Sequence, residues 1–167
     1  AKEVQKAEKA REAGQCMGEA LPELRDIMHK IKETYDVHKS NVGVGSTIFA
    51  VKPGDGSARE QAASCQKVLG GWANIANEYA TKRYRSNLIN WGMLPFIIDK
   101  GELPFENGDY IFIPEIQDAI MNKVSTIKAF VVNKDMKEFE LKLDELTDDE
   151  RQIILDGCLI NYYRENK

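Results

Sequence analysis

The sequence predicts an α/β fold, a mixed sheet with a parallel β-α-β core and an antiparallel hairpin, and two observations indicate it. Short apolar segments alternate with helical patterns between residues 46 and 98, as is typical of parallel strands joined by right-handed crossovers. Apolar and polar residues then alternate in segments 125–132 and 138–143, on either side of a short polar connection. That pattern is typical of two antiparallel strands with one buried face.

The parallel core is predicted from five consecutive segments. Gly70 and Gly71 end the first helix and Gly92 ends the second, because glycine readily takes the left-handed conformation that closes a helix. Small and apolar residues share one face of the first helix, namely Ala62, Ala63, Cys65, Val68 and Leu69. The predicted strands are 46–51, 72–77 and 93–98, and the helices between them are 58–69 and 78–91.

Further elements are predicted on both sides of this core. The charged, alanine-rich residues 1–14 are expected to form a solvated helix or a frayed lead-in. Thr147 and Glu150 have the spacing of a capping box, which predicts where the last helix begins. The remaining predicted elements are a helix over 21–35, a strand within 106–113 after an Asn-Gly turn, a short helix over 114–123 and an amphipathic helix over 147–163.

Composition and charge bound the possible functions. Hydrophobic residues make up 43% and charged residues 30% of the 167 residues, which is typical of a soluble globular protein of about one domain. We expect one domain over 1–167, with a helical lead-in (1–40), a β-α-β-α-β core (46–98) and a hairpin with a terminal helix (107–167). The formal net charge of -4 gives no general attraction to nucleic acid or anionic lipid. No apolar run approaches the roughly 18 residues of a membrane span, and no signal-peptide pattern opens the chain.

The cysteines Cys16, Cys65 and Cys158 are odd in number and far apart in the sequence. This pattern is typical of reduced thiols in a cytoplasmic protein, and it fits neither a disulfide framework nor a zinc or iron–sulfur site. We therefore expect no metal in this chain. His29 and His38 are expected at the surface.

Two other features have ordinary structural explanations. The basic segment 81–87 could contact nucleic acid, but a solvated helix face explains it better. The aromatic residues expected in the core are Trp72, Trp91, Phe96 and Phe112.

The segment "VKPGDGSAREQAASC", residues 51–65, carries the most specific chemistry. A glycine-rich turn between a strand and a helix is a ready anion site, because the first N–H groups of the helix lack partners. Gly54 and Gly56 allow unusual backbone conformations. Ser57 supplies a hydroxyl, and Arg59 supplies a planar fork suited to a carboxylate or phosphate. From the local pattern alone, Ser57 as a helix cap and Arg59 as an exposed helix residue explain the turn better than a binding site does.

Three segments in this region resemble the aconitase superfamily, in its swivelling C-terminal domain. "GDGSAREQAA" (54–63) is similar to the family turn "GxGSSREHAA", and "LGGWANIA" (69–76) is similar to "LGG-x-A-x-I". "SNLINWGMLPF" (86–96) is similar to "NL-x-x-x-G-L-L-P-L". The resemblance spans residues 48–98 and implies a swivelling β/β/α domain of aconitase type, related to the small subunit of isopropylmalate isomerases.

The resemblance also implies roles for individual residues. The first serine of the family motif removes the proton beside a substrate carboxylate, and here it is Ser57. The following arginine, Arg59, would hold a substrate carboxylate, with Gly56 and Ala58 completing the substrate-binding turn. Ala58 departs from the family, where a second serine contacts the substrate, so citrate or isocitrate need not be the substrate. Glu60 is expected to brace the turn.

The implied activity is that of a hydro-lyase acting on a small hydroxy polycarboxylic acid. The family's 4Fe-4S cluster would be held by partner domains or a large subunit, so this chain would bind no cofactor and be inactive alone. Whether it is part of a longer hydratase or a separate subunit stays open. The alternative is a non-catalytic binding or regulatory module that keeps the fold, as in aconitase relatives that bind RNA. The acidic charge argues against RNA, and we expect neither nucleic acid nor a membrane as a partner.

Overall fold

The computed structural model describes residues 2–165, so Ala1 of the predicted lead-in and residues 166–167 of the predicted C-terminal part lie outside the described residues. The strands form a mixed sheet in the order β1-β2-β3-β6-β5-β4. The elements, with η for a 3-10 helix, are α1 (Lys2–Glu12), η1 (Met17–Glu19), α2 (Glu23–Thr34), η2 (Lys39–Asn41), β1 (Ser46–Ala50), α3 (Arg59–Val68), β2 (Gly71–Ala76), α4 (Lys82–Asn90), β3 (Leu94–Ile97), β4 (Ile111–Phe112), α5 (Ile116–Met121), β5 (Thr126–Val131), η3 (Val132–Lys134), β6 (Lys137–Leu143), α6 (Asp148–Leu155) and α7 (Leu159–Glu165).

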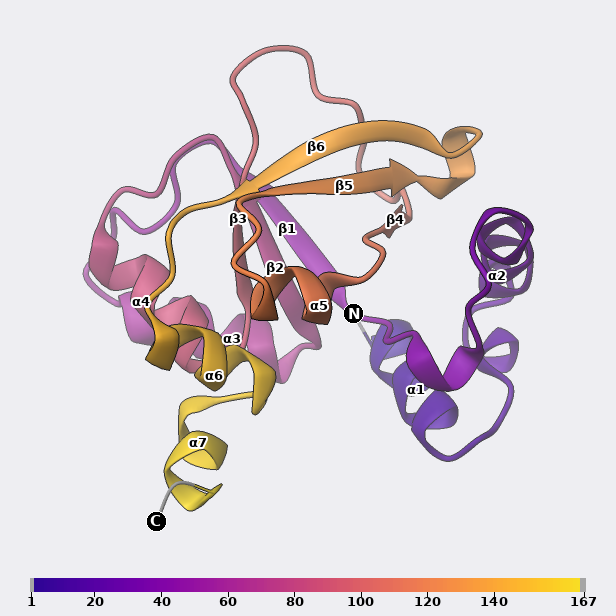
Figure 1. Cartoon of the computed structure of the whole chain (residues 1–167), viewed down its shortest axis with the longest axis horizontal. Helices are drawn as coiled ribbons and strands as arrows, with labels where there is room; N and C mark the ends of the chain where they lie inside the picture. The colour runs from indigo at the N-terminus through magenta and orange to yellow at the C-terminus, as the bar shows by residue number, and fades with distance from the viewer. Residues whose placement is uncertain (1, 166–167) are drawn as a thin grey trace.

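The predicted parallel core is confirmed. β1 pairs with β2 and β2 pairs with β3, all in parallel, and α3 and α4 form the two connections. α4 begins later than the predicted residue 78, because the side chain of Thr81 accepts a hydrogen bond from the Tyr84 N–H and caps the helix there. Figure 1 shows α3, α4 and α6 gathered on one side of the molecule. Since the strands are parallel, their carboxyl ends meet at one edge of the sheet.

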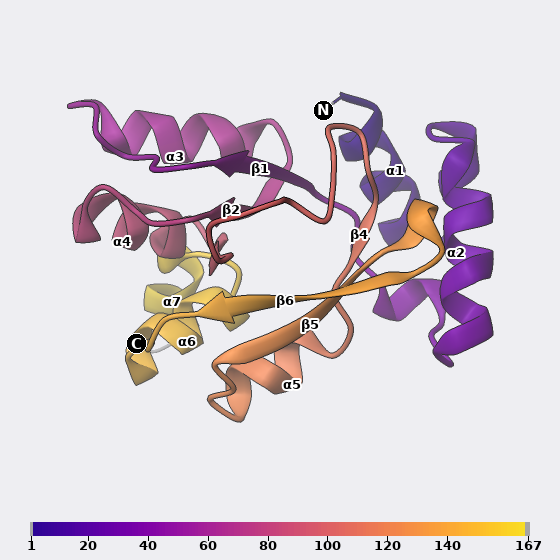
Figure 2. The same cartoon turned by 90° about the horizontal axis from the view of Figure 1, so that it is seen from above.

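The predicted hairpin is also confirmed. β5 and β6 are antiparallel, and β6 joins β3, so the hairpin extends the parallel half into one sheet. Figure 2 shows the hairpin running from the side of α6 toward α2. β4 is only Ile111–Phe112, shorter than the predicted strand, because the preceding turn is closed by the Asp109 carboxylate, which accepts from the Glu106 N–H at 2.8 Å.

The largest hydrophobic core contains side chains from both halves of the sheet and from α5 and α6. Its fully buried members include Ile75, Phe96 and Leu141. Burial of one such side chain contributes about 1.5–3 kcal/mol, so this shared core holds the parallel and antiparallel strands together. Phe96 and Phe112 are buried, as predicted.

The prediction that Trp72 lies in the core is wrong, and Trp91 is only half-buried. Trp72 is 38% exposed. Its ring covers the backbone before β1: a Cβ on Gly45 would lie 2.3 Å from Trp72 Cγ, so only glycine fits beneath the ring. Trp72, near the start of β2, therefore packs against the loop that precedes β1.

α3 forms where predicted, but its apolar face is mostly not buried. Of the five residues predicted to share that face, Ala63 alone is buried. Val68 is 70% exposed and Leu69 is 54% exposed. The helix therefore contacts the sheet and α4 along a narrow line around Ala63.

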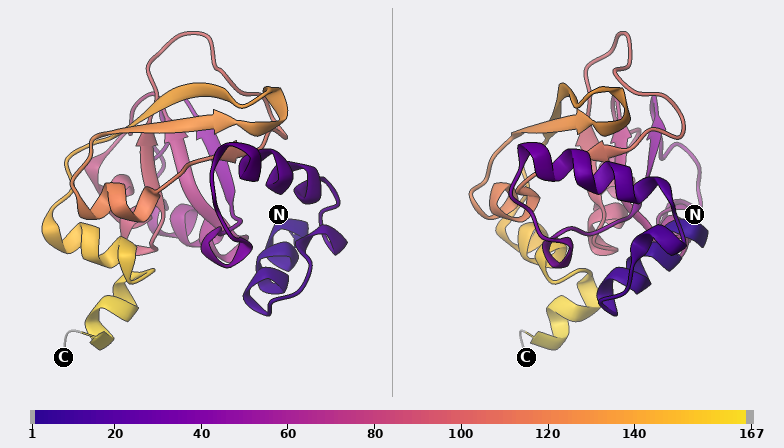
Figure 3. Two further views of the ribbon diagram at one scale, coloured as in Figure 1. Left: turned by 45° about the vertical axis from the view of Figure 1, so that its right-hand side comes forward. Right: turned by 90° about the vertical axis from the view of Figure 1, so that its right-hand side faces the viewer.

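The N-terminal helix α1 is anchored, contrary to the expectation of a solvated or frayed lead-in. Ala7 is fully buried, and Glu8 accepts from the Val44 N–H at 2.7 Å. Arg11 donates to Glu8 Oε2 at 2.9 Å and to the Ser40 carbonyl at 3.1 Å. Figure 3 shows α1 and α2 together at one end of the molecule, away from α7.

The segment 147–163 forms two helices instead of the one predicted. The capping box is confirmed, since Thr147 Oγ1 accepts from the Glu150 N–H at 3.2 Å and Glu150 Oε2 accepts from the Thr147 N–H at 3.1 Å. α6 ends at Leu155, and Gly157 has a φ of 89° that interrupts the helix. α7 then projects away from the rest of the molecule (Figure 1).

The basic segment 81–87 is only partly the solvated face that the sequence predicted. Lys82 and Arg83 are exposed, but the side chain of Arg85 is only 15% exposed. No helix within residues 2–165 is both long and apolar enough to cross a membrane.

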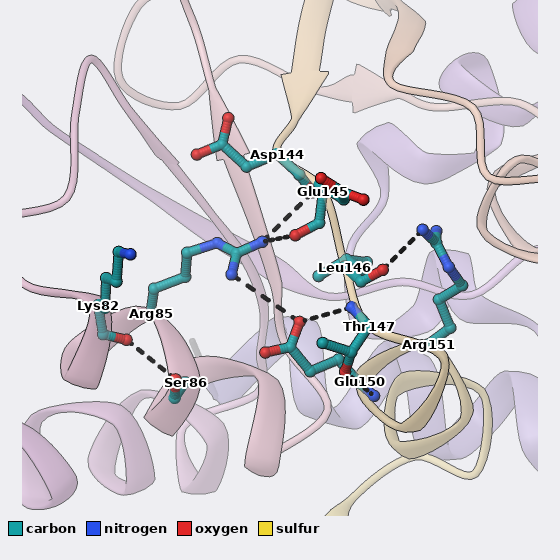
Figure 4. Close-up of polar contacts among 9 residues, drawn as sticks. All are labelled: Lys82, Arg85, Ser86, Asp144, Glu145, Leu146, Thr147, Glu150 and Arg151. Atoms are coloured by element: carbon teal, nitrogen blue, oxygen red, sulfur yellow. Dashed lines mark hydrogen bonds and ion pairs between the residues drawn. The ribbon is translucent and has the colours of Figure 1, made fainter.

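Arg85 connects α4 to the linker between β6 and α6. Its Nη2 donates to the carbonyls of Asp144 at 3.3 Å and Glu145 at 3.1 Å, and its Nη1 lies 3.9 Å from Glu150 Oε2. Figure 4 shows Arg151 approaching the same linker from the opposite side. The two guanidinium groups therefore fix the path of this linker.

Candidate functional site

The candidate site is the turn between β1 and α3, at the carboxyl edge of the parallel strands. Gly54 has a φ of 95°, which favours glycine, and a Cβ there would lie 2.5 Å from Tyr84 Cγ. Gly56 does not need this freedom: it has no positive φ, and a Cβ there would meet no described atom within 4 Å. The turn therefore requires glycine at position 54, while the space beside Gly56 is open.

The turn is tied to the segment that follows β2. The Glu78 N–H donates to the Val51 carbonyl at 3.1 Å, and the Ala80 N–H donates to the Pro53 carbonyl at 2.9 Å. An exposed ion pair of 3.2 Å joins Lys52 and Glu78, and such pairs add little stability. The two backbone hydrogen bonds therefore position the turn.

Ser57 is exposed and does not cap the helix. The N-cap of α3 is Ala58, with φ -87° and ψ 49°, and it has no side-chain cap hydrogen bond. Among the described residues, the Ser57 hydroxyl has no hydrogen-bond partner. The first N–H groups of α3 lack intrahelical partners and lie at the positive end of the helix dipole. Negative charge beside Ser57 is therefore favoured.

Arg59 is the first residue of α3 and is half-buried. Its Nε donates to the Gly54 carbonyl at 3.1 Å. Its terminal nitrogens have no hydrogen-bond partner among residues 2–165. The guanidinium is thus held against the turn by one nitrogen and keeps two nitrogens for a ligand.

Glu60 braces the turn, as expected. Its Oε1 accepts from Trp91 Nε1 at 2.7 Å. With the Asn87 amide oriented so that its nitrogen faces this carboxylate, Asn87 donates to Glu60 Oε2 at 3.2 Å and accepts from the Glu60 N–H at 3.2 Å. These contacts join the start of α3 to the end of α4 and occupy the carboxylate.

Tyr79 lies near the same edge and stays protonated. Its hydroxyl donates to the carbonyl of Phe96 at 2.9 Å, and the Asn74 carbonyl lies 3.3 Å away. Burial raises the pKa of Tyr79 well above its ordinary value, and the neighbouring Tyr84 adds to the effect. Tyr79 is therefore a structural donor and not a base.

Two cavities lie away from the turn. One of about 600 Å³ is lined by Arg11, by the segment before β1 and by the chain from β4 into α5, with Ile75 and Phe96 among its apolar residues. Another of about 310 Å³ lies beside α5. Ser57 and Arg59 line neither of these two cavities, and Ser57 is exposed to solvent.

The described residues contain no group of three or more His, Cys, Asp or Glu side chains that could hold a metal ion. Cys16 and Cys65 are exposed and Cys158 is half-buried, all as free thiols. An iron–sulfur cluster needs several thiolates brought together, so this donor set does not fit one. His29 and His38 are exposed, as expected.

The sequence patterns did not identify Tyr84 and Asn74 as neighbours of the turn. Both are 2% exposed, and Asn74 is a polar residue within the buried strand β2. A polar side chain inside a predicted parallel strand was the available signal, because such strands are normally apolar on both faces.

Comparison with known proteins gives the family. Residues 7–101 match the model of the aconitase C-terminal domain. The chain is 30% identical over 156 residues to aconitate hydratase A of Rickettsia bellii, covering 89% of this chain and 17% of that protein. It is 35% identical over 116 residues to the methanogen homoaconitase small subunit of Methanocaldococcus jannaschii, covering 68% and 58%. The crystal structure of 3-isopropylmalate dehydratase from the same organism is similar, with a TM-score of 0.56, 28% identity and coverage of 88% and 83%.

The chain thus spans 17% and 58% of the lengths of the two curated relatives that it matches. The family match covers more than half of the chain and includes the whole parallel half of the sheet with the turn that carries Ser57 and Arg59. This chain belongs to the aconitase C-terminal domain family.

Proposed function

We propose that this chain is the swivel domain or small subunit of an aconitase-like hydro-lyase acting on a small hydroxy polycarboxylic acid. Ser57 is the base and Arg59 binds a substrate carboxylate, with Gly56 and Ala58 beside them. The proposal is supported by relatives that include an aconitate hydratase, a homoaconitase small subunit and a 3-isopropylmalate dehydratase. The observation that carries it is an exposed Ser57 hydroxyl at the amino end of α3, two residues before Arg59, with neither this hydroxyl nor the terminal guanidinium nitrogens bonded within residues 2–165.

The serine hydroxyl needs help to act as a base, because it is far too weak an acid near neutral pH. The N–H groups of α3 and the Arg59 guanidinium would both stabilise the alkoxide. Water weakens such stabilisation, and Ser57 is exposed. A second surface must therefore close over the turn, and we assign it to a partner domain or large subunit that carries the 4Fe-4S cluster.

Two consequences follow for residues 1–167, which we take as one swivel domain. We expect the chain alone to be inactive, since residues 2–165 contain no donor set for a cluster and Ser57 is open to solvent. Ala58 offers no hydroxyl to the substrate, so the preferred acid makes one polar contact fewer at this position than in relatives with a second serine.

Replacement of Ser57 by alanine in the assembled enzyme tests the proposal. Because general-base catalysis contributes typically 10²–10⁴-fold, we expect Ser57→Ala to lower kcat by about that factor while substrate affinity is largely retained. The control is Ser64→Ala on the same helix, whose hydroxyl donates only to the Gln61 carbonyl at 3.2 Å. Unchanged turnover in Ser57→Ala would reject the base and favour the non-catalytic module.

Arg59→Lys tests the carboxylate contact. An ammonium cannot reproduce a two-pronged contact with a carboxylate, so we expect a raised KM, measured by steady-state kinetics of the assembled enzyme. A KM equal to that of the parent enzyme would contradict the role of Arg59.

A further inference from the structure

A buried polar cluster lies beneath the turn. The hydroxyl of Tyr84 on α4 accepts from Gln66 Nε2 of α3 at 3.1 Å and from Asn74 Nδ2 of β2 at 3.2 Å. The amide oxygens of Gln66 and Asn74 are buried and have no hydrogen-bond partner among residues 2–165. Such groups cost free energy in a core, so simple packing does not explain why three polar side chains meet here.

The ring of Tyr84 links this cluster to the candidate site. Gly54 lies so close to the ring that a Cβ there would be 2.5 Å from Tyr84 Cβ and Cγ. The carbonyl of the same glycine accepts the Arg59 Nε hydrogen bond. A continuous series of contacts therefore runs from the buried hydroxyl through the ring and Gly54 to Arg59.

We infer that Tyr84 is a positioning residue for this turn. Its ring packs against Gly54 and fixes the position of that residue, and thereby the placement of Ser57 and Arg59. The hydrogen bonds from Gln66 and Asn74 hold the ring in that position, since they fix its hydroxyl to α3 and to β2. That Tyr84 affects catalysis rests on the proposed function. That it holds the turn in place, its mechanical role, does not depend on that function.

Amide hydrogen exchange of the full chain tests the mechanical role. Exchange rates of hydrogen-bonded amides report local opening, so Tyr84→Leu, which removes the ring support, should speed exchange of the Glu78 and Ala80 amides, which donate to the Val51 and Pro53 carbonyls of the turn, by about tenfold. Tyr84→Phe keeps the ring and should speed it by about threefold, with the amides of β5 and β6 unchanged. The matched control is Tyr35→Leu, whose ring packs on Phe112 and Phe130 in another part of the molecule.

The triple variant Gln66→Met/Asn74→Val/Tyr84→Phe separates positioning from stability. Replacing all the polar partners of the cluster by apolar groups of similar shape is nearly neutral, so its melting temperature should return toward that of the parent chain. Exchange of the Glu78 and Ala80 amides should stay as fast as in Tyr84→Phe, because the ring is still not held by hydrogen bonds. A purely structural role would restore both quantities together and would overturn the inference.

Two further results would overturn it: exchange of the Glu78 and Ala80 amides in Tyr84→Leu that matches the parent, or the same acceleration there in Tyr35→Leu. The failure of the proposed function looks different. If Ser57→Ala retains turnover, the catalytic proposal falls, while the exchange rates still decide the role of Tyr84. If Ser57→Ala is inactive and the exchange rates do not change, the function stands without this inference.

Discussion

Asp109 shows at the scale of one residue how a short polar network shapes the chain. Its carboxylate accepts from Asn133 Nδ2 at 2.7 Å and from the Glu106 N–H, and Lys134 lies 3.2 Å away. The Asn133 hydrogen bond, followed by that from Glu106, lowers the pKa of Asp109 below its ordinary value. The ionised form is therefore favoured in the folded protein.

This shift predicts a loss of stability in acid. Because the pKa of Asp109 is lower in the folded chain than in the unfolded chain, its contribution is present above the unfolded pKa and is lost as pH falls through the folded pKa. Asp109→Asn should lower the free energy of unfolding at pH 7 and make it fall less steeply on acidification. Urea unfolding at pH 7 and below pH 4 measures the free energy of unfolding and its fall with pH, with Asp26→Asn on α2 as the control. If that free energy falls equally steeply with pH in the parent and in Asp109→Asn, the assignment to Asp109 is contradicted.

At the scale of elements, the junction between α4 and the α6–α7 turn depends on two glycines. Gly92 ends α4 with a φ of 71°, and a Cβ there would lie 1.8 Å from the Gly157 carbonyl oxygen. Glycine at the end of a helix is readable from sequence. The contact with a second glycine is not, because the two are far apart along the chain.

Gly92→Ala should therefore destabilise the protein more than strain alone explains. Alanine at a positive φ costs roughly 1 kcal/mol, and the clash with backbone should bring the total to about 2–4 kcal/mol. Gly108→Ala is the control, since Gly108 has a φ of 90° and its Cβ would meet no described atom within 4 Å. Equal losses in urea unfolding would show that no backbone contact is made at Gly92.

The same scale explains which elements the sequence could predict. The parallel strands and the hairpin follow from apolar patterns and glycine turns, so β1, β2, β3, β5 and β6 form as expected. The exposed face of α3 was not predictable, because a pattern gives the apolar side of a helix but not what lies beside it. The break at Gly157 had a signal in the Asp-Gly pair, but the apolar pattern that continues beyond it predicted a single helix.

At the scale of the whole molecule, Arg85 joins the parallel half to the C-terminal part. Its guanidinium is bound to the carbonyls of Asp144 and Glu145 in the linker that follows β6 (Figure 4). Arg83 lies two residues earlier on the same helix, and its side chain is exposed. The two arginines look alike in sequence, and only the placement of α6 distinguishes them.

Arg85→Met should lower the free energy of unfolding by about 1–2 kcal/mol, because the linker carbonyls of Asp144 and Glu145 lose a charged donor. Arg83→Met is the matched control and should change it by less than about 0.5 kcal/mol, as is usual for surface substitutions. Urea unfolding of both variants measures the difference. Similar values for the two would show that Arg85 does not hold the linker.

The sequence by itself determined most of the strand and helix order, the parallel core, the hairpin and the position of the glycine-rich turn, since all of these follow from local pattern and turn chemistry. Tertiary structure decided that Ser57 is free of the helix cap, that Glu60 is occupied by α4 and that Tyr84 lies under Gly54. These facts depend on contacts between segments distant in the chain, and such contacts exist only once the sheet has brought α3 and α4 together.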